Sequence, residues 1–242
     1  MRRETVKLNA KGKVQIIAHR GMSALETENT AAAFIAAGNS SCYGVETDIY
    51  RTADGQFILN HDGNSGRICN ENLVMTESTL ADLQALVLND INTGLPRNDL
   101  RLCTPKEYRD ICEHYAKVCV PELKNDFTLE EIRAILDIFD GYLDKTCFIS
   151  NKMDNLDKVK QLCPEQTCQF LSSSYKDVFP TYLKEHGVGM DIAGWALTQE
   201  RVETLVDAGI PVNVWTIDDP EAAEQFIRWG VSQITSNILE VI

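Results

Sequence analysis

The feature that most constrains the fold is a regular alternation of short β-branched runs with stretches that carry helix signals. Eight runs rich in valine, isoleucine and aromatic residues are predicted strands: 13–18, 43–50, 117–124, 145–150, 167–172, 188–193, 211–217 and 231–236. Strands that alternate with helices in this way pair in parallel as βα units. The sequence therefore predicts an α/β protein.

The predicted helices have clear start and stop signals. Thr104-Pro105 is a helix cap followed by proline, and Glu107 completes a capping box. Glycine, which readily adopts the left-handed conformation that stops a helix, follows three predicted helices where the chain turns into the next strand, at Gly187, Gly209 and Gly230. Eight strands with such short connections favour a closed (β/α)8 TIM barrel over an open sheet.

One segment is too long for a minimal barrel. Residues 51–103 separate the second predicted strand from the next helix, and they begin with the hairpin-type turn Thr52-Ala53-Asp54-Gly55. We expect this segment to be a small insertion on the catalytic face. The chain 1–242 is then expected to form a single domain.

Charge and composition exclude several classes of partner. The 242 residues carry a formal net charge of −13, which argues against binding to nucleic acid or to an anionic membrane surface. No run approaches the ~18 apolar residues of a membrane span, and no signal-peptide h-region is visible, so a cytoplasmic protein without a stable membrane anchor is expected. Eight cysteines without a C-x-x-C pair suggest buried, reduced thiols. The oligomeric state stays open.

Carboxylates occur at alternate positions on two predicted strands. Glu46 and Asp48 share one strand face, and Glu122 and Lys124 share a face of the following barrel strand. If these strands are neighbours, three carboxylates converge beside one ammonium group. Three oxygen ligands suit one divalent cation, Mg²⁺ or Ca²⁺. The alternative, surface charges on edge strands, fits poorly because a closed barrel has no edges.

Two histidines lie where strands are predicted to end. His19 ends the first strand beside Arg20, and His61 follows a short apolar run. Histidine titrates near neutral pH, and the guanidinium fork of Arg20 suits phosphate oxygens. This set predicts phosphate-ester hydrolysis, with the positive charge supplied locally because the overall charge repels an anion. The remaining histidines, His114 and His186, fall in predicted helices and are interpreted as structural.

Two further residues are candidate substrate contacts. Asn29 either contacts the substrate or caps the predicted helix 30–37, and the two roles are compatible. Trp215 either lines the substrate pocket or fills the barrel interior. In the pocket its ring would stack on the substrate or attract a cationic group.

The order of these motifs resembles one known family. His19-Arg20-Gly21, Glu28-Asn29-Thr30, Glu46-x-Asp48, His61-Asp62 and Glu122-x-Lys124 resemble the motifs of the glycerophosphodiester phosphodiesterase family. The runs 214–217 and 231–235 resemble the V-W-T-V-N and closing G-V-D-G-I-I-T-D strands of that family. The resemblance therefore covers nearly the whole chain.

The resemblance implies a TIM barrel with an insertion after the second strand and a metal-dependent enzyme. The reaction implied is hydrolysis of small-molecule glycerophosphodiesters to an alcohol and sn-glycerol 3-phosphate. Metal binding by Glu46, Asp48 and Glu122 is implied, with His19 and His61 as general acid and base in an unassigned order. Arg20 and Lys124 would contact the phosphate. The nucleophile, water or an internal glycerol hydroxyl, stays open.

The chain departs from the family pattern at three places, of which the first is a local loop change and the other two, at the active face, leave the head group open. Thr27 replaces a proline, Ser236-Asn237 replaces a threonine–aspartate pair, and Asp218 stands where asparagine is usual. One alternative is a lysophospholipase D or a cyclising phospholipase on the same scaffold, with an acyl chain entering beside residues 73–75 and 80–88. Another is a phosphodiester-binding protein that has lost catalysis, which the full set of expected catalytic residues disfavours.

Overall fold

The computed structural model of the protein describes residues 4–10 and 12–242. Eight parallel strands form a closed barrel, since β2 pairs with both β10 and β3. Around the ring these strands are β2 (Gln15–Ala18), β3 (Gly44–Arg51), β5 (Val118–Leu123), β6 (Cys147–Ser150), β7 (Thr167–Ser172), β8 (Gly189–Ala193), β9 (Val212–Trp215) and β10 (Gln233–Ser236). Each lies within a predicted strand or overlaps it almost completely, so the predicted TIM barrel is confirmed.

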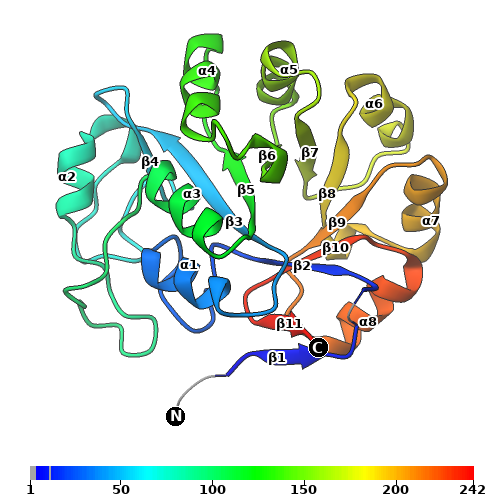
Figure 1. Cartoon of the computed structure of the whole chain (residues 1–242), viewed down its shortest axis with the longest axis horizontal. Helices are drawn as coiled ribbons and strands as arrows, with labels where there is room; N and C mark the ends of the chain where they lie inside the picture. The colour runs from blue at the N-terminus through cyan, green and yellow to red at the C-terminus, as the bar shows by residue number, and fades with distance from the viewer. Residues whose placement is uncertain (1–3, 11) are drawn as a thin grey trace.

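Helices surround the ring of strands (Figure 1). Those that connect successive barrel strands are α1 (Ala31–Gly38), α3 (Pro105–His114), α4 (Leu129–Ile138), α5 (Met153–Leu162), α6 (Phe179–His186), α7 (Gln199–Asp207) and α8 (Pro220–Trp229). The short helices η2 (Leu143–Lys145) and η3 (Gly194–Ala196) lie in connections. The Thr104–Glu107 capping box is formed, and Gly187 and Gly230 have φ angles of 64° and 99°. The predicted start and stop signals therefore act as expected.

The two ends of the chain pair with each other outside the barrel. Strand β1 (Val6–Leu8) runs parallel to β11 (Leu239–Val241), which follows β10 where a further helix would complete the repeat (Figure 1). The sequence analysis missed both strands. Each has only three residues, and a parallel pair this far apart in sequence has no local signal.

Apolar packing divides into layers. The largest cluster fills the space between the barrel and its helices, while Ile17, Val120, Cys147 and Ile149 form a smaller cluster of their own. All eight cysteines are free, and all except the half-buried Cys163 are buried, in agreement with the prediction. No helix among residues 4–10 and 12–242 combines the length and apolar character that a membrane crossing requires.

The long segment between β3 and α3 has its own apolar cluster. It contains β4 (Phe57–Leu59), η1 (Met75–Glu77) and α2 (Leu80–Ala85), and β4 pairs antiparallel with β3 through the predicted turn. Leu83, Leu86 and Leu88 are fully buried in a cluster with Ile58 and Met75. These leucines are therefore occupied by packing and do not line an open entrance for an acyl chain.

Candidate active site

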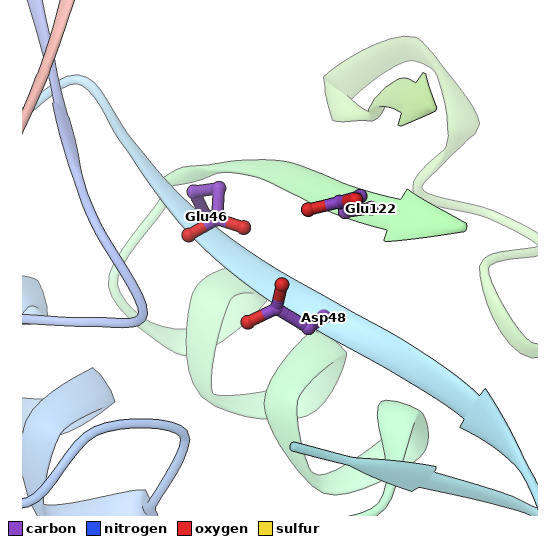
Figure 2. Close-up of side chains that lie close together, drawn as sticks. All are labelled: Glu46, Asp48 and Glu122. Atoms are coloured by element: carbon purple, nitrogen blue, oxygen red, sulfur yellow. The ribbon is translucent and has the colours of Figure 1, made fainter. Parts of the chain in front are cut away.

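Three carboxylates meet at one position on the barrel. Glu46 and Asp48 come from β3 and Glu122 from the adjacent β5, where Asp48 and Glu122 are paired in register. Figure 2 shows the three side chains close together, Glu46 and Asp48 on β3 and Glu122 on β5. One oxygen from each lies within 4.8 Å of the others, and all three residues are buried. The structure thus brings the predicted set together in a cluster that could hold a metal ion.

The electrostatics of this cluster fit a bound cation. Burial and the neighbouring Asp48 raise the pKa of Glu122 to about 7, and the same two causes raise the pKa of Glu46 well above its ordinary value. Burial alone would also raise the pKa of Asp48, but Lys124 and Arg20 lower it overall. Oδ1 of Asp48 is buried and, apart from its ion pair with Lys124, has no hydrogen-bond partner among the described residues. Such an excess of buried negative charge is what a divalent cation with oxygen ligands would compensate.

Lys124 and Arg20 flank the carboxylates with positive charge. Nζ of Lys124 lies 3.2 Å from Asp48 Oδ1 and 3.2 Å from Glu122 Oε2. The backbone N–H of Arg20 donates to Glu46 Oε2 at 2.9 Å, and its Nε lies 3.7 Å from Asp48 Oδ2. Lys124 is the first residue after β5, and its side chain reaches the same carboxylate cluster as Glu122 on that strand.

The turn after β2 places Arg20 by close packing against α1. Arg20 has a φ of 56°, in the left-handed region, and Gly21 follows with a φ of 82°. A Cβ on Gly21 would lie 2.6 Å from the backbone carbon of Ala33, so only glycine fits there. The backbone N–H of Asn29 donates to the Arg20 carbonyl at 3.0 Å and secures the turn.

His19 is largely buried and has an amide as its partner. Its Nδ1 lies 2.8 Å from Oδ1 of Asn237, and its Nε2 lies 4.0 Å from Glu46 Oε2. Nδ2 of Asn237 donates to Asp218, which fixes the amide with its oxygen toward the ring. The ring therefore carries its proton on Nδ1 and leaves Nε2 as an acceptor. Burial and the Arg20 charge lower the pKa of His19 to about 4.

His61 lies just beyond β4 and has a carboxylate as its partner. Its Nδ1 lies 2.8 Å from Oδ1 of Asp62. Burial is the main cause that lowers its pKa, and Asp62 opposes this shift. The two histidines therefore have chemically different supports, an amide for His19 and a carboxylate for His61.

All predicted site residues except Asp48 and Asn29 line a small cavity of about 200 Å³. Its lining includes His19, Arg20, Glu46, His61, Glu122, Lys124 and Trp215. The ring of Trp215 meets that of the exposed Trp195 edge-on, with centroids 5.5 Å apart. Of the two open placements for Trp215, the structure has it in the wall of this cavity.

Asn29 lies behind the cavity rather than in its lining. It is fully buried, donates to Asp48 Oδ2 at 3.0 Å and accepts from Thr47 Oγ1 at 2.6 Å. Thr30, not Asn29, caps α1, so the capping interpretation of Asn29 is wrong. The local pattern could not separate the two because adjacent Asn and Thr are both good caps.

Asp191 is a cavity residue that the sequence analysis missed. It lies on β8, is 1% exposed, and its Oδ1 has no hydrogen-bond partner among the described residues. Burial and the nearby Glu122 raise its pKa well above the ordinary value. The available signal was an aspartate inside the apolar run Gly189–Ala193.

Comparisons with known proteins agree with this geometry. The model of the glycerophosphoryl diester phosphodiesterase family matches residues 19–240. The glycerophosphodiester phosphodiesterase of Caldanaerobacter subterraneus subsp. tengcongensis is 26% identical over 95% of this chain and 96% of that protein. That of Bacillus subtilis is 25% identical over 93% of this chain and 84% of that protein.

A solved structure shows the same likeness in three dimensions. The Oleispira antarctica phosphodiesterase, in complex with its product sn-glycerol 3-phosphate, aligns with a TM-score of 0.86 and 25% identity. The alignment covers 93% of each chain. The family match spans His19, His61, the three clustered carboxylates and every barrel strand after β2. The chain belongs to the glycerophosphoryl diester phosphodiesterase family.

Proposed function

We propose that this protein hydrolyses glycerophosphodiesters to an alcohol and sn-glycerol 3-phosphate with the help of one divalent cation, Mg²⁺ or Ca²⁺. The observation that carries the proposal is one cavity lined by two histidines, an arginine, a lysine and two members of the buried carboxylate cluster. The names of the relatives and the product bound to the Oleispira antarctica enzyme support the same substrate class. The proposal treats residues 1–242 as one domain, with 51–103 as an insertion.

Glu46, Asp48 and Glu122 would hold the cation. When bound, it supplies Lewis acidity toward a phosphoryl oxygen and offsets the charge of the three carboxylates. Asn29 has a supporting role in this proposal: its hydrogen bond to Asp48 orients one ligand. We therefore place Asn29 behind the substrate site and not in contact with the substrate.

Arg20 and Lys124 bind non-bridging phosphate oxygens in this proposal. Their positive charges reduce the repulsion that a phosphodiester anion presents to a nucleophile. This local charge is needed because the chain as a whole carries −13. Trp215 forms a wall for the glycerol or the head group.

The two histidines transfer protons on opposite sides of the phosphorus atom. One accepts the proton of the attacking hydroxyl group, and the other donates a proton to the departing alcohol oxygen. The free Nε2 of His19 and the ring of His61 both border the cavity. Attack by water gives sn-glycerol 3-phosphate directly, whereas attack by the glycerol 2-hydroxyl first gives a cyclic phosphate.

A substrate comparison tests the proposal. The protein, supplied with Mg²⁺ or Ca²⁺, is incubated with glycerophosphocholine or lysophosphatidylcholine, and products are identified by ³¹P NMR. We expect sn-glycerol 3-phosphate from glycerophosphocholine and little turnover of the lysolipid, because Leu83, Leu86 and Leu88 are buried. Preferential release of lysophosphatidic acid would support a lysophospholipase D, and a persistent cyclic phosphate would indicate attack by the internal hydroxyl. Binding without turnover of either compound would support a non-catalytic protein.

A further inference from the structure

We propose that Arg67, which lies outside the cavity lining, is a positioning residue that holds the phosphate-binding Arg20 and the acid–base His61 in one arrangement. The proposal rests on the proposed function and adds a residue that the motifs did not single out. Arg67 comes from the segment between β3 and α3, so it would link that segment to the chemistry.

The guanidinium of Arg67 joins two carboxylates from separate parts of the chain. Its Nη1 and Nη2 donate to the two oxygens of Glu28, each at 2.7 Å. Its Nε donates to Asp62 Oδ2 at 2.6 Å. A bidentate pair together with a third bond uses a planar fork of donors that only arginine has.

Both carboxylates also contact residues that line the cavity. Oε1 of Glu28 also accepts from Nη1 of Arg20 at 2.9 Å. Oδ1 of Asp62 lies 2.8 Å from Nδ1 of His61. One continuous path of hydrogen bonds therefore runs from Arg20 through Glu28, Arg67 and Asp62 to His61.

Along this path the two arginines also compensate the negative charges of Glu28 and Asp62. Burial would raise the pKa of Glu28, but its hydrogen bonds and charge contacts with Arg67 and Arg20 lower it overall. Without Arg67, Glu28 would have Arg20 as its single cation, and their tighter pairing would compete with phosphate for Arg20. Asp62 would also lose the bond that keeps its carboxylate turned toward His61. Both consequences reduce turnover without removing any group that contacts the substrate.

Lysine is the informative replacement at this position. It keeps the positive charge but cannot make the bidentate pair and the third bond together. If charge alone matters, Arg67→Lys retains activity. If the fork matters, Arg67→Lys lowers the activity nearly as much as Arg67→Ala does.

Arg97 provides a matched control in the same segment. Its Nη1 donates to Glu26 at 2.8 Å and to Asp90 at 2.9 Å, and its Nε donates to Asp99 at 2.9 Å. Its Nη2 also donates to the second oxygen of Asp99 at 3.0 Å. Like Arg67, Arg97 therefore combines a bidentate carboxylate pair with further carboxylate contacts, and it binds four oxygens where Arg67 binds three. Unlike Glu28 and Asp62, none of these partners has a side-chain hydrogen bond to a cavity-lining residue within the described part of the chain. Arg97→Lys and Arg97→Ala thus report the general effect of losing such a fork.

The experiment compares Lys and Ala variants at both positions in the full chain with metal added. We expect Arg67→Ala and Arg67→Lys to lower kcat for glycerophosphocholine by about 10- to 100-fold, the usual effect of removing a supporting partner. We expect the Arg97 variants to keep kcat close to the wild-type value, although their Tm changes as much as that of the Arg67 variants. Added guanidinium ion should restore part of the activity of Arg67→Ala and leave Arg97→Ala unchanged.

A spectroscopic readout separates this proposal from the proposed function. The ¹⁵N shift of His61 Nδ1 reports its bond to Asp62 and requires no turnover. It should move in Arg67→Lys and stay fixed in Arg97→Lys. An unchanged shift, or equal loss of kcat at both positions, would overturn the role of Arg67. A wild-type protein that hydrolyses no glycerophosphodiester would overturn the proposed function instead, and the shift comparison would still decide on Arg67.

Discussion

The Nδ1 of His19 lies 2.8 Å from the amide oxygen of Asn237, and Asn237 in turn donates to the carboxylate of Asp218 at 2.7 Å. Relative to the family pattern that the sequence resembles, the amide and the carboxylate have exchanged places. The carboxylate of Asp218 therefore reaches the imidazole only through the amide of Asn237. Burial and Arg20 lower the pKa of His19 to about 4, although the hydrogen bond to Asn237 and the charges of Asp48 and Glu28 oppose this shift.

Exchanging the two residues should shift the pH–rate profile. The double variant Asn237→Asp/Asp218→Asn keeps one amide and one carboxylate but puts the carboxylate beside His19. A carboxylate stabilises the imidazolium, so the pKa of His19 should rise and one limb of kcat/KM against pH should move to higher pH.

The limb that moves identifies the role of His19. Movement of the acidic limb assigns it as the base, and movement of the alkaline limb assigns it as the acid. The exchange is a better test than Asn237→Asp alone, which would place two carboxylates against each other. A profile in which neither limb moves to higher pH would contradict this account of His19.

Removing either cavity histidine should slow turnover strongly. His19→Ala and His61→Ala are each expected to lower kcat by roughly 10²- to 10⁴-fold, the usual contribution of general acid–base catalysis. His186 is a suitable control because its Nδ1 also pairs with an aspartate, at 2.6 Å from Asp157 Oδ1, but on a helix end. His186→Ala should keep a rate near wild type. Near-normal turnover by both cavity variants would refute their assignment.

Removing the metal should make stability depend on pH through the carboxylate cluster. Glu122 has a folded-state pKa of about 7 against an ordinary value of 4.5. A raised pKa gives stability that is full below pH 4.5 and lost as pH rises through about 7. The loss from this one group is on the order of 3 kcal/mol.

Thermal unfolding with chelator and with added metal measures this effect. The gap in Tm between the two states should widen as the pH rises through that window, because the cation binds the ionised carboxylates. Glu122→Gln should flatten the pH dependence of the metal-free protein while abolishing turnover. A constant gap across the window would argue against metal binding by this cluster.

Trp215 should favour cationic head groups. Its ring borders the cavity, and a cation over an indole face gains enough energy to change affinity roughly 2- to 30-fold. Trp215→Leu should therefore raise KM for glycerophosphocholine more than for glycerophosphoglycerol, whose head group is neutral. Equal changes in KM would indicate that Trp215 only shapes the cavity.

The barrel could be predicted because its signals are local. Apolar runs, the Thr104 cap and glycine stops such as Gly230 each act within a few residues, and repetition made the topology clear. Convergence of Glu46 and Glu122 followed from side-chain alternation once their strands were taken as neighbours. In these cases the periodicity of the local sequence is enough to predict where the side chains lie.

What could not be predicted depends on contacts between distant segments. Arg67 stands in a polar loop, and its link to Glu28 arises only after the segment folds against the turn that follows β2. The role of Asn29 was undecided because a cap and a buried partner of Asp48 have the same local sequence. Asp191 lines a cavity formed by residues that are far apart in the sequence, so no local pattern indicates it.

The measurement that tests the central claim most directly is metal-dependent product release. Protein stripped of metal is given glycerophosphocholine, and sn-glycerol 3-phosphate is followed before and after addition of Mg²⁺ or Ca²⁺, with Glu122→Gln in parallel. The account predicts no release without metal, restored release by the wild type with at least one of the two ions, and none by the variant. Full release by the stripped protein, or equal restoration of the variant, would contradict it.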